Sequence, residues 1–164
     1  MRHTRWFVSF AALLCIALGG CAAKSSQPGL GEAGDAELDD LIIPGRRVGP
    51  VSLGMSEAAM RQLMGQPLET HQTEDSRMYE FRQMSVVVPT NTRRVELVIV
   101  PAPFYKTITG LTVGDEESKI SAALGKPARQ TGRGVYVTTC YSNGLVFNYY
   151  NGTVDNIVVR TPGC

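Results

Sequence analysis

Hydrophobic and polar positions along the chain recur at an offset of sixty residues. The segment SLGMSEAAMRQLMGQP at 52–67 returns as TVGDEESKISAALGKP at 112–127. The matching positions are Val51 with Leu111, Gly54 with Gly114, Met60 with Ile120, Met64 with Leu124, Gly65 with Gly125 and Pro67 with Pro127. Similarity at one fixed offset indicates an internal repeat, so we expect two copies of one structural unit.

Each copy predicts a short amphipathic helix. Apolar stripes with helical spacing are formed by Ala59, Met60, Leu63 and Met64 in the first copy and by Ile120, Ala123 and Leu124 in the second. Ser56 and Asp115 are the predicted N-caps. Gly65 and Gly125, each followed by a proline two residues later, are predicted to end the helices with a positive φ.

Strand-forming segments follow each helix. They read RMYEFR, MSVVV and RRVELVIV in the first copy, and VYVTTCY, GLVFNYY and VDNIVVR in the second, with Asn-Gly turns between the later ones. We therefore predict an α+β fold of two tandem modules at 42–104 and 105–164, each a short helix packed on a three-stranded antiparallel meander. The leading segments GRRVGPVSLG and YKTITGLTVG are expected to add short edge elements.

The N-terminus has the pattern of a secretory signal at residues 1–20, with basic residues before a short apolar run. Its end, LGGC, resembles the lipobox of bacterial lipoproteins, which implies lipidation of Cys21; an ordinary signal peptide or a single membrane anchor is the alternative. Residues 21–41 are rich in Ser, Gly and acidic residues and predict a flexible tether. In Gram-negative lipoproteins, which this N-terminus resembles, an Asp after the cysteine marks retention in the inner membrane; the resemblance therefore implies that a chain with Ala22 and Ala23 at these positions is at the outer membrane, facing the periplasm.

Charge and cysteine content narrow the class of protein. Removal of Arg2 and Arg5 with the signal reduces Lys and Arg from 16 to 14 against 15 acidic residues, a net charge of about −1. Nothing in this balance favours nucleic acid as a partner. Besides Cys21, the mature chain retains only Cys140 and Cys164, and we expect a disulfide between them in an oxidising compartment.

Residues that could perform catalysis are few. His71 is the one histidine of the mature chain, in the polar segment ETHQTEDSR that we interpret as a loop; with no other ligand at zinc spacing, no metal site is predicted. A thiol nucleophile of Cys140 with His71 is the enzymatic alternative. The acidic run at 115–117 is interpreted as helix capping, and TGRG at 131–134 as a flexible loop that fails as a phosphate-binding motif. We expect no cofactor and no enzymatic activity.

Aromatic residues of the second copy divide between two faces of the predicted sheet. By strand alternation, Phe147 and Tyr149 point to the core with Leu145, whereas Tyr150 points the other way. Tyr136 and Tyr150 are the candidate binding residues, because exposed tyrosines on a sheet face are typical of protein contacts. Shielding of the sheet, or packing against the other repeat, is the alternative.

The order of these motifs resembles a known family. A turn with LGM, a helix that ends in GQP or GKP, a hairpin and a last V-x-x-I-x-V strand are similar to the helix-plus-meander unit of the SmpA/OmlA (BamE-like) family of outer-membrane lipoproteins. The doubled layout with a disulfide in the second unit is similar to tandem-repeat β-lactamase inhibitor proteins. Both resemblances imply a non-catalytic binding scaffold with an envelope protein as partner; a periplasmic inhibitor or ligand-binding protein is the alternative.

Overall fold

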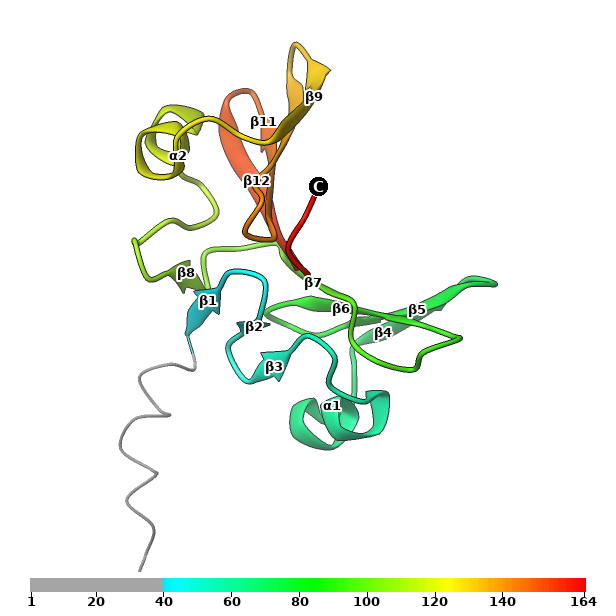
Figure 1. Cartoon of the computed structure of the whole chain (residues 1–164). Helices are drawn as coiled ribbons and strands as arrows, with labels where there is room; N and C mark the ends of the chain where they lie inside the picture. The colour runs from blue at the N-terminus through cyan, green and yellow to red at the C-terminus, as the bar shows by residue number, and fades with distance from the viewer. Residues whose placement is uncertain (1–39) are drawn as a thin grey trace, which may run out of the picture. The chain divides into compact units, whose positions relative to one another are not determined.

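The computed structural model describes residues 40–164, which contain twelve strands and two short helices (Figure 1). The strands of the first half are β1 (Leu41–Ile43), β2 (Arg47–Val48), β3 (Val51–Ser52), β4 (Glu69–Gln72), β5 (Ser76–Glu80), β6 (Ser85–Pro89) and β7 (Leu97–Val100). Those of the second half are β8 (Lys106–Thr107), β9 (Arg129–Arg133), β10 (Tyr136–Cys140), β11 (Leu145–Tyr150) and β12 (Thr153–Arg160). The helices are α1 (Glu57–Met64) and α2 (Glu117–Leu124).

Eight of these strands form one antiparallel sheet in the order β4-β5-β6-β7-β12-β11-β10-β9. Four strands come from each repeat, and the last strands of the two repeats pair at the centre. In this central pair Ile157 lies opposite Val100, and Val159 lies opposite Val98. The strand order reads the same from both edges, so the two repeats are related by an approximate twofold axis between β7 and β12.

The predicted fold class, two modules with a helix on a three-stranded meander, is wrong. Strands are the dominant regular structure of the described residues, beside two short helices, and one eight-stranded sheet crosses both repeats. The sequence did not indicate β4 and β9, because all of their side chains are exposed and they lack an alternation of apolar and polar residues. The two meanders merge because the free edges of β7 and β12 each leave backbone donors and acceptors unpaired until they join.

The leading segments form a sheet of their own and add nothing to the edges of the large one. This small sheet has the order β3-β2-β1-β8, in which β1 pairs in parallel with β8 and places Ile42 opposite Thr107. It therefore joins the start of the described chain to the start of the second repeat. The expectation that the leading segments add short edge elements to the repeats is therefore wrong, because their strands belong to this separate four-stranded sheet.

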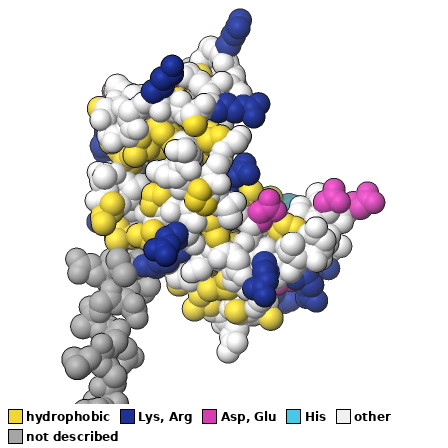
Figure 2. Space-filling view, in the orientation of Figure 1, with side chains coloured by type: hydrophobic (Ala, Val, Ile, Leu, Met, Phe, Trp, Pro, Cys, Tyr) yellow, Lys and Arg dark blue, Asp and Glu magenta, His cyan; other side chains and the backbone are white. Residues whose placement is uncertain are grey.

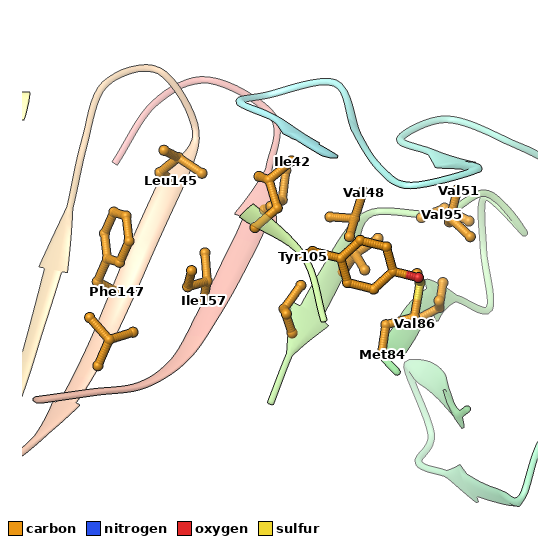
Figure 3. Close-up of a cluster of buried hydrophobic side chains, with 14 of the residues drawn as sticks. Ile42, Val48, Val51, Met84, Val86, Val95, Tyr105, Leu145, Phe147 and Ile157 are labelled. Carbon is orange, nitrogen blue, oxygen red and sulfur yellow. The ribbon is translucent and has the colours of Figure 1, made fainter. Parts of the chain in front are cut away.

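The core lies between the small sheet and one face of the large sheet. Figure 3 shows Ile42 of β1 beside Leu145 and Ile157, while Val48 lies beside Tyr105. Side chains from both repeats thus belong to a single buried cluster, and Ile42, Val48, Leu145 and Ile157 have no exposed surface. Full burial of each such aliphatic side chain contributes about 1.5–3 kcal/mol, so the shared core holds the two repeats and the small sheet together.

The helix boundaries test the capping predictions. The Ser56 Oγ accepts the Ala59 N–H at 3.2 Å, which confirms the first N-cap. Asp115 is not the second N-cap: α2 is preceded by Glu116, whose side chain makes no capping bond, whereas Asp115 accepts the Thr112 N–H at 2.8 Å.

The glycines that end the helices behave as predicted. Gly65 and Gly125 both have φ of 74°, so the positive φ is confirmed at both positions. Their ψ values of −148° and −152° lie outside the left-handed helical region, in a conformation that is close to glycine-only.

The apolar stripes of the two helices are narrower than predicted: Met60 and Ile120 are fully buried, but Leu63 is 51% exposed.

Among residues 40–164, no helix has the length and apolar character needed to span a membrane. The predicted signal at 1–20, the predicted lipidation site Cys21 and nearly all of the predicted tether lie outside the described residues.

A candidate binding face on the eight-stranded sheet

The large sheet has one face in the core and one face turned away from it. Along β6, β7 and β11 buried residues alternate strictly with partly buried or exposed ones, as expected for strands with one covered face. We call the side away from the core the open face. Its central side chains are aliphatic, and we call them the apolar band: Met78, Val87, Leu97, Ile99, Val146 and Val158.

The apolar band is continuous across five neighbouring strands. Val158 of β12 lies opposite Ile99 of β7 on one side and opposite Val146 of β11 on the other. On β6, Val87 lies opposite both Met78 and Leu97. All six members are partly exposed, so the band crosses the junction of the two repeats as one partly solvent-accessible apolar surface.

Tyr136 and Tyr150 lie on the open face beyond the apolar band, as alternation predicted. They are paired across β10 and β11, and their ring centroids are 5.0 Å apart with the planes tilted by 45°. Their exposed fractions are 67% and 47%. The sequence also placed Phe147 and Tyr149 correctly in the core.

The β9 end of the open face is cationic. Arg129 and Arg133 of β9 lie opposite Cys140 and Tyr136, which places their side chains on this face. The TGRG segment is part of β9 and of the turn that follows, so its interpretation as a flexible loop is wrong. Figure 2 shows several Lys and Arg side chains at this end, although others lie over the rest of the visible surface, and it shows the acidic side chains near β4 and β5.

The structure pairs Cys140 with Cys164 in a disulfide, with α-carbons 5.9 Å apart. This bond ties the C-terminal residues to β10 beside the cationic end. Cys140 and His71 are not brought together, since β10 and β4 are separated by five strands of the sheet.

His71 lies in β4 and not in a loop, which corrects the interpretation from the sequence. Its Nε2 is 3.3 Å from Oε1 of Glu80 and 3.7 Å from Oε2 of Glu69. Glu69 and Glu80 are directly opposite across β4 and β5, and His71 follows Glu69 by two residues on the same face. The open face therefore ends in an acidic edge that carries one imidazole.

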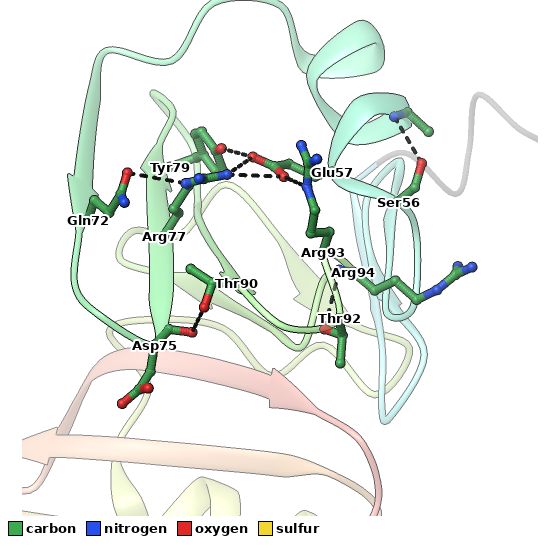
Figure 4. A network of polar contacts seen from close by, with 11 residues as sticks. Ser56, Glu57, Gln72, Asp75, Arg77, Tyr79, Thr90, Thr92, Arg93 and Arg94 are labelled. Atoms are coloured by element: carbon green, nitrogen blue, oxygen red, sulfur yellow. Dashed lines mark hydrogen bonds and ion pairs between the residues drawn. The ribbon is translucent and has the colours of Figure 1, made fainter.

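A second polar cluster lies on the core face of the large sheet, on the same side as helix α1 (Figure 4). Glu57, the first residue of α1, is 4% exposed and accepts a hydrogen bond from the hydroxyl of Tyr79. Arg77 Nη1 lies 3.1 Å from Glu57 Oε1, and Arg93 Nε lies 2.9 Å from Glu57 Oε2. A buried carboxylate with two cations and a hydroxyl is fully paired, so this cluster fixes α1 to the sheet.

These contacts determine the ionisation of Glu57. The Tyr79 hydrogen bond lowers its pKa most; burial opposes the shift, and Arg93 and Arg77 reinforce it, so that the pKa falls from 4.5 to about 2. Tyr149 is not part of this cluster, but burial in the core raises its pKa to about 12. Both groups stay in their ordinary charge state at neutral pH, which suits structural roles better than proton transfer.

No family model matches the chain, and no curated protein matches it. Among solved structures, the uncharacterized protein yfeY from Escherichia coli is similar, with a TM-score of 0.51 and 12% identity over 72% of this chain and 98% of that one. An extracellular protein with an SCP domain from Bacillus anthracis gives a TM-score of 0.47 and 9% identity over 66% of this chain and 44% of that one. The likeness to yfeY concerns the fold alone, and the second match is too weak to support an argument.

Sequence reasoning found the tyrosine pair but missed the apolar band, the Glu69–His71–Glu80 cluster and the burial of Glu57. The apolar runs in MSVVV and RRVELVIV could have indicated the band, because an uninterrupted run places apolar side chains on both faces of a strand. The two polar clusters join residues from different strands, and no local spacing reveals them.

Proposed function

We propose that this protein is a non-catalytic lipoprotein of the outer membrane that binds another envelope protein through the open face of its large sheet. The observation that carries the proposal is the apolar band. An aliphatic strip across five strands, flanked by a tyrosine pair, is the kind of surface that protein interfaces bury.

The two ends of the open face add specificity to this proposal. The apolar band lies between an acidic edge with Glu69 and Glu80 and a cationic edge with Arg129 and Arg133. A partner with complementary charges at the two ends of an apolar centre fits in one orientation only. This role agrees with the binding scaffold implied by the resemblance to the SmpA/OmlA family, although neither solved neighbour is described as a member of it.

The membrane anchor in this proposal rests on the LGGC motif. We expect Cys21→Ala to remain an unprocessed precursor without acyl chains, because the proposed lipid is carried by the cysteine side chain and the new N-terminus. Metabolic labelling with palmitate and mass spectrometry of the full-length protein would measure this. Normal maturation and labelling of Cys21→Ala would refute the lipoprotein assignment.

The binding face is tested by capture of partners in the bacterial envelope. We expect Ile99→Thr with Val158→Thr, and separately Tyr136→Ala with Tyr150→Ala, to reduce recovery of the main crosslinked partner about tenfold or more, which corresponds to at least about 1.4 kcal/mol. Threonine keeps β-branching and strand propensity but removes apolar contact area. Quantitative mass spectrometry measures the recovery, with circular dichroism as a check on folding.

A matched control removes exposed apolar residues elsewhere. Leu63 and Leu68 are 51% and 75% exposed, lie outside the strands of the large sheet, and should be replaceable by Ala without loss of partner. Equal recovery by all folded variants would contradict the proposed face. The identity of the partner decides between roles: a component of outer-membrane assembly supports the scaffold, whereas a soluble enzyme or a glycan supports the inhibitor or ligand-binding alternative.

A further inference from the structure

We propose that Glu69, His71 and Glu80 form a binding site for a transition-metal cation such as Zn²⁺. The three side chains each offer one ligand atom, and these atoms lie within 4.8 Å of one another. Imidazole nitrogen and carboxylate oxygen are both common zinc ligands, and three protein ligands leave a fourth position open.

The distances between the ligand atoms fit a small tetrahedral ion. Zn²⁺ with ligands at 2.0–2.2 Å in tetrahedral geometry holds those ligand atoms about 3.3–3.6 Å apart. His71 Nε2 lies 3.3 Å from Glu80 Oε1 and 3.7 Å from Glu69 Oε2, close to that spacing. Two carboxylates would balance the charge of the ion, and the carboxylate oxygens of the third pair also lie within 4.8 Å of each other.

The backbone fixes the positions from which these side chains extend. Glu69 and Glu80 form a directly opposed pair between β4 and β5, while His71, two residues along the strand, lies opposite Met78 on the same face. The ligands thus stand on two hydrogen-bonded strands, which is a more rigid base than a loop.

The electrostatics of the same strand pair also favour a cation here. Two glutamates directly opposite each other in an antiparallel pair repel one another and destabilise the pairing. No Lys or Arg within residues 40–164 makes an ion pair with either of them, and their one charged-group contact is His71. A divalent ion between the two carboxylates converts this repulsion into attraction.

The second repeat provides an internal comparison. At the sixty-residue offset the three positions are held by Arg129, Thr131 and Cys140, and Cys140 is used by the disulfide. The site is therefore a property of the first repeat and not of the fold. It lies on the open face, where the fourth coordination position is available to water or to a side chain of a bound protein.

Calorimetric titration of the purified full-length protein with Zn²⁺ tests the site. We expect one ion per chain, with binding weakened about tenfold or more by His71→Ala and by Glu80→Gln, and a raised melting temperature for the wild type in Zn²⁺. The matched control is Glu74→Gln, which removes the same charge from the nearby turn outside the cluster and should bind as the wild type does.

Glu80→Gln also allows a second test, in which the melting temperatures of the variant and the wild type are compared with and without Zn²⁺. Without metal this variant should melt at the same temperature as the wild type or higher, because the repulsion with Glu69 is gone, and it should gain no stability from Zn²⁺. Absence of Zn²⁺ binding, equal binding by His71→Ala and the wild type, or equally tight binding of Mg²⁺ and Ca²⁺ would each overturn the proposal. These results are independent of partner capture by the open face.

Discussion

Glu57→Gln is expected to lower the free energy of unfolding by about 3 kcal/mol at pH 7. The variant keeps the size of the side chain but removes the charge that Arg77, Arg93 and Tyr79 surround. The magnitude follows from the fall of the pKa from 4.5 to about 2, because each pKa unit corresponds to about 1.4 kcal/mol. Urea or guanidinium denaturation of both proteins measures the difference.

The pH dependence provides a sharper form of this prediction. Because folding lowers the pKa of Glu57, the ionised carboxylate stabilises the fold fully above pH 4.5, and this contribution is lost as the pH falls toward 2. The stability difference between the wild type and Glu57→Gln should therefore shrink over that interval. A difference that stays constant from pH 7 to pH 2 would contradict the assigned network.

Glu117→Gln is the matched control at the equivalent position of the second helix. Glu117 N–H donates to Gly152 O as Glu57 N–H donates to Arg93 O, so the two residues hold the same place in the repeats. The positions that match Arg77 and Arg93 are Val137 and Gly152, which carry no charge. We expect Glu117→Gln to change stability by less than about 0.5 kcal/mol.

Gly144→Ala is expected to destabilise the protein by about 3 kcal/mol or more. Gly144 has φ of +90°, and an added Cβ would lie 2.2 Å from the Arg160 carbonyl oxygen and 2.9 Å from the Gly45 α-carbon. Both obstacles are backbone atoms that cannot rotate away, so the overlap adds to the strain of a positive φ. The turn touches both β12 and the β1–β2 turn, and the variant should loosen the junction of the small sheet with the second repeat.

Gly134→Ala separates the cost of overlap from the cost of backbone conformation. Gly134 has φ of +71°, but an added Cβ meets no atom within 4 Å. Its expected cost is about 1 kcal/mol, the strain of the positive φ alone. Midpoints of chemical denaturation for the two variants give the comparison, and similar losses would show that the contacts at Gly144 do not constrain the turn.

Much of the local structure could be predicted from the sequence. The repeat offset and the Gly-x-Pro helix ends placed both helices, and alternation placed Leu145, Phe147 and Tyr149 in the core and Tyr150 outside it. These features depend on residues close together in the chain, where propensity and periodicity carry the signal. The edge strands β4 and β9 could not be found this way, because their residues bury nothing.

Long-range pairing accounts for the remaining errors. No pattern in the sequence states that β7 continues into β12, since hydrogen bonds between backbones depend little on side-chain identity. The sequence did not indicate the burial of Glu57, which became evident only when Arg77 and Arg93, 20 and 36 residues away, were placed beside it. His71 suggested an isolated surface residue until Glu80 was placed across the neighbouring strand.

The mirrored strand order has a consequence for how such a sheet arises. A chain with only one repeat would have β7 as an unpaired edge strand. Two such chains could pair their β7 strands through the same antiparallel contact, and the resulting homodimer would have two identical ends. When both copies belong to one chain, their sequences need not be identical. Each half can then evolve separately, as the Glu57 cluster on one side and the disulfide on the other illustrate. A homodimer of identical halves would accept a ligand in two equivalent directions, whereas the two unlike halves of this chain distinguish one direction from the other.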